Sequence, residues 1–400
     1  MIRAIAVLSA IFAIAAAVTV SGGLSFDRDG LMLTETEGMT VVSLAECGAT
    51  WEVGAPSLPI AVAHLVIPQD MKVTGIRLDY YETEPVEGEF DVWPVQKPRP
   101  ISESGPFEYV SPDPAYYGAF QYPSDVVTSG GQGSMSGYNI ASVFVAPVQH
   151  TADERKLVFH PEVRFTVEME SEELDVVRIR NRSEAARRRI EENLAGLVLN
   201  PEDLAGFAPA ASVDPALGPY DHVVITSPEL AAQFATMGSF IESNMGLNDT
   251  VVTTDDIYAS YQGGDNPEKV RNFIKHAYSD WSTTHILLAG DCEVVPHRQA
   301  YGSLNGVRLL IACDLYYSDL DRDWNADGDR IPGEPEDSVD MYPDVYVGRV
   351  CVDSPSSVER FTGKLTTYAG DSTFDYLRNI LLTGFDLDSS TSRGLGDVYK

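Results

Sequence analysis

A change of hydrophobic pattern near residue 200 constrains the fold of this chain more than any other feature. Before it, segments such as 64–68, 73–81 and 163–169 alternate apolar and polar residues between turn residues, which is typical of half-buried β-strands. We expect residues 24–177 to form an all-β, sandwich-like domain. Residues 93–133 are rich in Pro, Ser, Gly and Tyr, and we expect long loops there.

After residue 220, short apolar strands alternate with amphipathic helices. Two helices are expected, one capped by Ser227 and the other by Asp265 or Asn266, each with a proline in its first turn. This alternation predicts a mostly parallel sheet with right-handed crossovers, whose functional residues lie at the carboxyl ends of the strands. The predicted fold class is therefore multidomain, an all-β domain followed by an α/β domain over residues 220–400. The expected strands are 222–226, 250–254, 285–289, 345–348 and 380–385, and a further helix is expected at 354–368.

Residues 178–219 connect the two halves. A helix is predicted at 182–199, and we interpret it as a solvated, arginine-rich helix face, with an exposed site for trypsin-like processing as the alternative. Residues 200–219 are rich in Pro, Ala and Gly, which is typical of a linker between domains.

The N-terminus has the order of a secretory signal. A basic residue, Arg3, precedes an apolar run over residues 4–20, and small residues follow. We predict a cleaved signal peptide at 1–23, with a membrane anchor as the alternative because the run is close to spanning length. No other stretch is apolar enough to cross a membrane, so we expect a secreted or extracytoplasmic protein, in the periplasm or at the cell surface.

The chain is strongly acidic, with a formal net charge of −32 and a pI near 4.4. Nucleic acid requires a basic surface, so this balance argues against a nucleic-acid partner and favours divalent cations. The acids are concentrated, because eleven lie between residues 314 and 344, where Arg322 and Arg330 are the basic residues. A solvated acidic loop is the simpler alternative, but such self-repulsion favours a bound cation.

Residues 323–334 have the spacing of a calcium loop, with oxygen donors at loop positions 1, 3, 5 and 12 and Gly328 at position 6. Arg330 at position 8 and the Pro332-Gly333 pair depart from a true EF-hand, so the likeness is limited to the loop. We expect Ca²⁺ to be bound by the side chains of Asp323, Asn325, Asp327 and Glu334 and by the main-chain carbonyl of Asp329.

A second group of reactive residues, 290–297, directly follows an apolar strand. It contains Cys292, Glu293 and His297, a position where sheet enzymes carry their sites. A Cys and a His that are close in sequence do not define a catalytic dyad, so we interpret both as structural. A disulfide between Cys292 and Cys313 is left open.

Several motifs after residue 220 resemble, in order, the gingipain family of cysteine peptidases. They are DNPEKVRNFI from Asp265, Trp281, HILLAGD from His285, CDLYY from Cys313, DRDWNADGD from Asp321 and YPDVYVGR from Tyr342. In the β-rich half, GAPSLP from Gly54 and VIP from Val66 resemble the pro-domain of that family. The resemblance implies a caspase-like catalytic domain in which a Cys thiolate attacks a peptide carbonyl and a His acts as base and acid.

The family's catalytic Thr-Gly-His-Gly type motif and its later Cys do not occur in these 400 residues. The resemblance therefore implies that the catalytic dyad follows Lys400 and that this part alone is inactive. Asp314 falls where the resemblance places an acid of the S1 pocket, although its place in the acidic run makes a calcium ligand an equal alternative. Glu293 is a candidate to orient the catalytic His.

The function expected from the resemblance is that of an exported cysteine endopeptidase zymogen. It would act on protein or peptide substrates, and its own β-rich prosegment would serve as an intramolecular inhibitor. The alternative is a non-catalytic surface or adhesion module in which calcium stiffens a binding loop.

Overall fold

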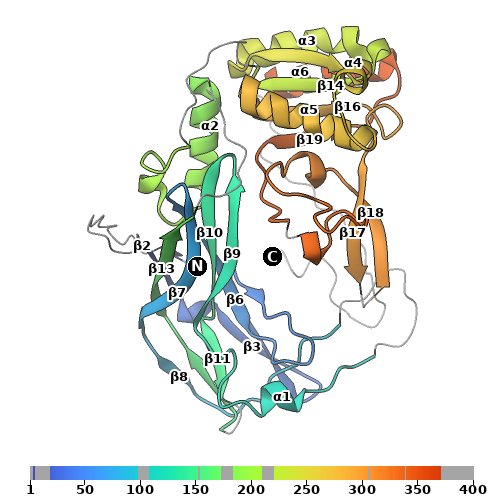
Figure 1. The fold of residues 1–400 in the computed structure, drawn as a ribbon. Helices are drawn as coiled ribbons and strands as arrows, with labels where there is room; N and C mark the ends of the chain where they lie inside the picture. The colour runs from blue at the N-terminus through green and yellow to red at the C-terminus, as the bar shows by residue number, and fades with distance from the viewer. Residues whose placement is uncertain are drawn as a thin grey trace.

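The computed structural model describes residues 3–4, 19–97, 108–151, 154–172, 183–209, 220–304, 307–337 and 339–370. A β-rich N-terminal domain and an α/β domain lie side by side, and helix α2 (Glu184–Ala195) lies where the two meet (Figure 1). This order confirms the predicted fold class. The strand predicted at 380–385 lies outside the described residues.

The N-terminal domain contains two four-stranded antiparallel sheets. One has the order β1 (Arg3–Ala4), β2 (Thr19–Ser25), β13 (Glu162–Ser171) and β7 (Met71–Tyr81). The other has the order β5 (Gly48–Ala49), β6 (Pro59–Ile67), β10 (Tyr138–Val145) and β9 (Val127–Met135). Smaller units are the hairpin β3 (Leu31–Thr36) and β4 (Met39–Leu44), and the three-stranded sheet of β11 (Val148–Thr151), β12 (Lys156–Phe159) and β8 (Glu84–Val86).

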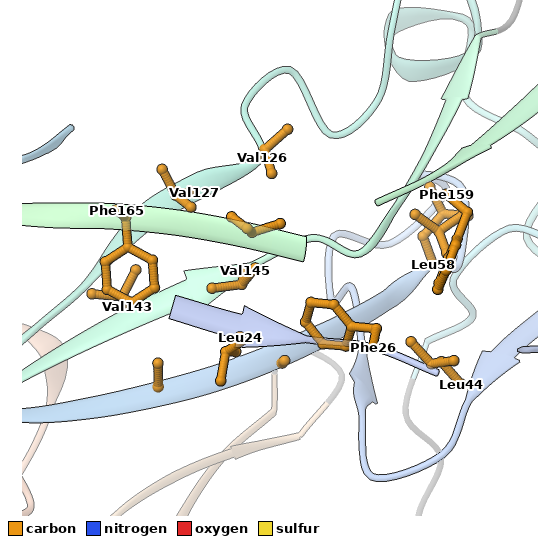
Figure 2. Close-up of a cluster of buried hydrophobic side chains, with 14 of the residues drawn as sticks. Leu24, Phe26, Leu44, Leu58, Val126, Val127, Val143, Val145, Phe159 and Phe165 are labelled. Carbon is orange, nitrogen blue, oxygen red and sulfur yellow. The ribbon is translucent and has the colours of Figure 1, made fainter. Parts of the chain in front are cut away.

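The two large sheets pack face to face around one apolar core. Alternate residues of β10 and β13 point into it, and Val143, Val145 and Phe165 are fully buried (Figure 2). The sheets approach closely at Gly22, because an added Cβ would lie 3.0 Å from Leu65 Cδ2. The alternation recognised in the sequence therefore has its physical cause in a sandwich core.

The short helix α1 (Pro114–Tyr117) and most of strand β9 (Val127–Met135) lie within residues 93–133, where the sequence predicts long loops. That prediction is wrong for these two elements, while residues 98–107 lie outside the described part. Strand β9 reads VTSGGQGSM, so it lacks the apolar alternation on which the prediction depended. It is an edge strand that pairs only with β10 in its sheet, and edge position relaxes the demand for apolar residues.

Strand β2 begins at Thr19, so residues 19–23, which the sequence assigns to the signal peptide, belong to the sandwich. Val20 is buried, and Gly22 pairs with Phe165 of β13. The small residue Gly22, interpreted as part of the end of a signal, also allows the close packing of the two sheets. Residues 5–18 of the predicted signal lie outside the described residues.

The α/β domain has a four-stranded, fully parallel sheet, as predicted. Its order is β15 (Asp249–Thr253), β14 (His222–Thr226), β16 (His285–Ala289) and β19 (Tyr346–Val350). One face is covered by α3 (Pro228–Met245) and α6 (Pro355–Gly370), the other by α4 (Thr254–Ser260) and α5 (Asn266–Trp281). Successive residues of β14 serve opposite faces, because Val223 joins the α5 side and Val224 the α3 side.

Helix α5 forms as its sequence predicts. The Asp265 side chain accepts the Glu268 N–H at 3.0 Å and caps the first turn, and the expected stripe of Val270, Phe273, Ile274, Ala277 and Tyr278 is buried. Helix α4 was not predicted, because seven residues are too few to reveal a helical period. The hairpin of β17 (Arg298–Leu304) and β18 (Val307–Cys313) was not predicted either.

Helix α2 is not simply a solvated helix. Its Ala186 packs in the α/β core, while Ile190 and Leu194 pack with residues of β6 and β10. Only its outer side matches the prediction, since Arg187 and Arg188 are exposed there. The helix therefore packs against both domains.

Residues 200–209 are not an extended linker. The Asn200 side chain accepts the Val66 N–H and donates to the Val66 carbonyl, both at 2.9 Å, and Leu204 is buried. An amide side chain that bonds to both backbone groups of a β6 residue fixes this segment to the sheet. The remaining predicted linker, 210–219, lies outside the described residues. Within the described part, no helix is both long and apolar enough to cross a membrane.

Candidate functional site

A cavity of about 500 Å³ lies at the carboxyl edge of the parallel sheet. It is lined by residues at the starts of four helices, α3, α4, α5 and α6, and by the segment that follows β16. Ligand sites of such sheets lie at this edge, where neighbouring strands send their helices to opposite faces. Its carboxylates come from Glu229, Asp255, Glu293 and Asp353.

The structure places Glu293, exposed, in the wall of this cavity. The Asp291 carboxylate accepts the N–H groups of Glu293 at 2.9 Å and Val294 at 3.2 Å, which closes the turn after β16. Cys292 is exposed, and the structure records no hydrogen bond between it and His297 in this described segment. All four cysteines are free thiols, so Cys292 and Cys313 are not bridged.

Asp314 follows β18 and pairs with Arg349 of β19. The guanidinium donates to both carboxylate oxygens, Nε to Oδ2 at 2.6 Å and Nη2 to Oδ1 at 2.8 Å. Its remaining Nη1 group donates to the carbonyls of Gly290, Asp291 and Val295, the last at 2.6 Å. In this arrangement Asp314 is the counter-charge of an arginine that fixes the turn after β16, and both of its oxygens are occupied.

The predicted calcium loop, 323–334, is a series of tight turns. Side-chain oxygens of three predicted ligands cap backbone groups: Asp323 accepts the Asn325 N–H, Asn325 accepts the Arg330 N–H and Asp327 accepts the Asp329 N–H. Oxygens of Asp327, Asp329 and Glu334 lie within 4.8 Å of one another and could hold a metal ion. Asp323 lies outside this group, and Asp329 enters it by its carboxylate rather than by the predicted carbonyl.

A second acidic group, formed by Asp319, Asp321 and Asp344, lies deeper. Their carboxylate oxygens also lie within 4.8 Å of one another. Asp319 and Asp344 are buried, and three oxygens, Asp319 Oδ1 and both of Asp321, are buried without a hydrogen bond. Buried carboxylate oxygens without a partner are costly, and a cation would satisfy them.

The electrostatics of this buried group are those of repelling anions. Burial, followed by the charge of Asp340, raises the pKa of Asp319 to about 6. Burial and the neighbouring Asp340 and Asp319 also raise the pKa of Asp321, and burial raises that of Asp344. Three carboxylates with raised pKa values, two of which have unsatisfied oxygens, are a donor set that fits a hard divalent cation.

Arg271 of α5 is buried beside this group but directs its N–H groups to the main chain. It donates to the main-chain carbonyls of Tyr316, Asp319 and Arg322 at 2.8 to 2.9 Å. The arginine therefore shapes the segment that carries Asp319 and Asp321 without bonding to their carboxylates. The group Asp319, Asp321 and Asp344 is hereafter the buried acidic site.

Sequence reasoning missed this site and chose the exposed loop next to it. The residues were inside the acidic run, but the spacing of a known loop motif drew attention to 323–334. The available signal was the Asp-Leu-Asp sequence at 319–321, shortly after the apolar Leu315–Tyr317 turn, together with Asp344 two residues before β19. Acids flanked by core residues are expected to be buried with a partner.

A comparison with models of known protein families gives a match over the α/β domain. The family model described as Peptidase family C25 matches residues 216–399. Residues 216–399, less than half of the chain, are therefore similar to a family of peptidases, C25, the gingipain family, as the resemblance of their motifs implied. No curated protein sequence gives a match.

Solved structures from Porphyromonas gingivalis are also similar in part. The complex of RgpB pro- and mature domains has a TM-score of 0.38 at 16% identity, covering 50% of this chain and 97% of that one. A structure on the zymogenic latency of gingipain K gives 0.32 at 20% identity, covering 43% of this chain and 100% of that one. Dimeric latent PorU gives 0.31 at 12%, covering 78% and 23%. The family assignment rests on the sequence match of residues 216–399.

Proposed function

We propose that this chain is the N-terminal part of an exported cysteine endopeptidase precursor of the gingipain type. The observation that carries the proposal is the C25 match over residues 216–399, preceded by a β-sandwich that packs against the same α/β domain through α2. In this proposal the sandwich is the prosegment and restrains the peptidase domain. The catalytic His and Cys follow Lys400.

The proposal is tested first by the gene. Translation past Lys400 should continue into a Gly-His-Gly type motif and then a Cys. The longer chain should hydrolyse fluorogenic peptides after its prosegment is released, and alkylation of the new Cys should abolish that activity. A natural stop directly after Lys400 would sink the proposal and favour a non-catalytic cation-binding surface module.

Export is proposed on the apolar run of residues 4–18 after Arg3. Because β2 needs Thr19 and Val20 for its pairing and its core contact, we expect the leader to be cut at or before Thr19, after the small residues Ala15 to Ala17. Mass spectrometry of the N-terminal peptide of the exported protein checks this. A mature N-terminus at Leu24 would contradict it.

The structural cofactor proposed is Ca²⁺, at the buried acidic site. Asp319, Asp321 and Asp344 offer carboxylate oxygens, the ligands that calcium prefers. Bound there, the ion would supply positive charge that offsets their repulsion, and it has no role in peptide hydrolysis. The group Asp327, Asp329 and Glu334, of which only Glu334 is buried, is proposed as a second, weaker site, because two of its oxygens already cap the loop backbone.

Two predicted roles at the sheet edge stay proposals. Glu293 is proposed to orient the catalytic His, on the support of its position in the cavity wall. For Asp314, its bidentate bond to Arg349 supports a structural role over an S1 acid or a calcium ligand. An S1 role would require Arg349 to release it.

A further inference from the structure

The segment 339–345 lies between the buried acidic site and the N-terminal sandwich. On the sandwich side it meets β9, the edge strand, whose outward N–H groups have no partner strand in the sheet. Ser134 N–H donates to Asp340 Oδ2 at 3.1 Å, and Ser136 N–H donates to the Pro343 carbonyl at 3.0 Å. The segment thus accepts hydrogen bonds from one amide of the edge strand and one amide of the turn that follows it.

Tyr342 is the centre of this contact. Its ring lies directly on Gly133, where an added Cβ would be 2.2 Å from ring atom Cδ2. Its hydroxyl bonds to Ser142 of β10, and the His64 ring meets it edge-on with centroids 6.3 Å apart. Tyr342 of the α/β domain therefore contacts residues of β6, β9 and β10.

On its other side the same segment is built into the buried acidic site. Asp344 belongs to both: its Oδ2 accepts the Leu320 N–H at 2.9 Å, and its Oδ1 accepts from Ser134 Oγ at 3.5 Å. Asp319 Oδ2 accepts the Met341 N–H at 3.2 Å. Two of the three acids of the site are thus bonded to, or part of, the segment that holds the sandwich.

We propose that occupation of the buried acidic site by a divalent cation controls how firmly the N-terminal sandwich is held on the α/β domain, with segment 339–345 as the coupling element. This inference rests on the proposed cation site. It assigns that site a role in the contact between prosegment and peptidase domain.

The physical reason is the mutual repulsion of the site's anions. Without a cation, ionised Asp319 and Asp321 repel the carboxylate of Asp344, which is joined through Pro343 to Tyr342. A cation bound by all three carboxylates offsets this repulsion and holds the segment in the position that receives Ser134 and Ser136. Linkage requires the reverse effect as well, so a docked sandwich strengthens cation binding.

The test uses the full chain and the exchange of individual amide hydrogens. The Ser134 and Ser136 amides report the contact, and the Val143 and Val145 amides of the central strand β10 report the sandwich itself. Exchanging calcium for EGTA should speed exchange at Ser134 and Ser136 by at least about tenfold, the factor that accompanies a 1.4 kcal/mol weakening of the contact. Exchange at Val143 and Val145 should not change.

Two variants and a binding measurement separate the possible results. Asp321→Asn removes one carboxylate without contacting the sandwich, and it should abolish the calcium dependence of exchange. Glu336→Gln, which removes an exposed acid of the same run, should leave that dependence intact. Calcium binding by the full chain and by both variants is measured by titration calorimetry under the same conditions.

Calcium binding that Asp321→Asn weakens, but that leaves exchange at Ser134 and Ser136 unchanged in the full chain, would overturn the coupling and leave the cation site standing. No calcium binding, or binding that Asp321→Asn does not weaken, would overturn the site and the coupling together.

Discussion

Replacing Asp319 by asparagine should change stability in opposite directions with and without calcium. The pKa of Asp319 is raised from 3.8 to about 6, mainly by burial. A difference of roughly two pKa units corresponds to about 3 kcal/mol, because each unit is worth 1.36 kcal/mol. In chelator at pH 8, ionised Asp319 therefore costs folding up to about 3 kcal/mol, and the Asp319→Asn substitution removes that cost.

The replacement should be sterically neutral. Asparagine has nearly the same shape, its carbonyl can accept the Met341 N–H that Asp319 accepts at 3.2 Å, and its amide can donate to the neighbouring carboxylates. In chelator the variant should therefore be more stable by about 3 kcal/mol, or unfold on the order of 6–12 °C higher for a domain of this size. In calcium at a thousandfold above Kd the wild type gains about 4.1 kcal/mol. This gain exceeds the advantage of the variant, which has lost a ligand, so the order should reverse.

In chelator, the free energy of unfolding of the wild type should fall as the pH rises through the titration of Asp319. The folded state holds a proton on Asp319 up to about pH 6, whereas the unfolded state loses it near 3.8. The folded state thus binds more protons in this window, so wild-type stability falls as pH rises through it. Below about pH 4 both states are protonated, and the advantage of the variant over the wild type should disappear.

The assay is urea or thermal unfolding followed by circular dichroism at about pH 8 and about pH 4, on either side of that window, each in EGTA and in calcium. Asp323→Asn, at an exposed position in the adjoining loop, is the matched control and should change the unfolding free energy by no more than about 0.5 kcal/mol in any of these conditions. The reasoning would be refuted if Asp319→Asn destabilised the protein equally in EGTA and in calcium.

Three further substitutions test separate contacts. Gly133→Ala should displace the Tyr342 ring, since the added Cβ would lie 2.2 Å from Cδ2. Amide exchange at Ser136 should then accelerate while the β10 amides stay protected. The same exchange rate at Ser136 in the variant and the wild type would contradict the contact. Asn200→Ala should lower the unfolding free energy by about 2–4 kcal/mol, because both buried polar groups of Val66 lose their partner, and a change under about 0.5 kcal/mol in urea unfolding would count against it. Asp314→Asn should cost about 1–3 kcal/mol by leaving Arg349 without its counter-charge; in the longer chain, a loss of cleavage after basic residues with unchanged stability would instead support the S1 role.

Local pattern predicted the elements whose neighbours are close in sequence. Helix α5 was predicted because the Asp265 cap, the proline and the apolar stripe lie within a few turns of one another. The strands of the parallel sheet were predicted because burial on both faces requires apolar residues at every position. Strand β9 was missed because VTSGGQGSM lacks apolar alternation, and hairpin β17–β18 was missed although its two strands are adjacent in sequence.

The acidic run shows the same division between sequence and structure. Composition alone predicts a cation partner for eleven acids within 314–344, and one group in the predicted loop could hold a metal ion. The sequence could not indicate that Asp344 would meet Asp319 and Asp321, because that meeting depends on how the chain returns from the acidic run to β19. Nor could it reveal that Asp314 faces Arg349, which lies 35 residues further along the chain.

The sequence by itself determined the two-part architecture, the family and the acidic character, since each depends on residue types at local spacing. Tertiary structure alone decided which carboxylates are buried without partners, and that segment 339–345 joins them to the sandwich. The physical reason is that burial and charge pairing are set by residues brought together from distant parts of the chain.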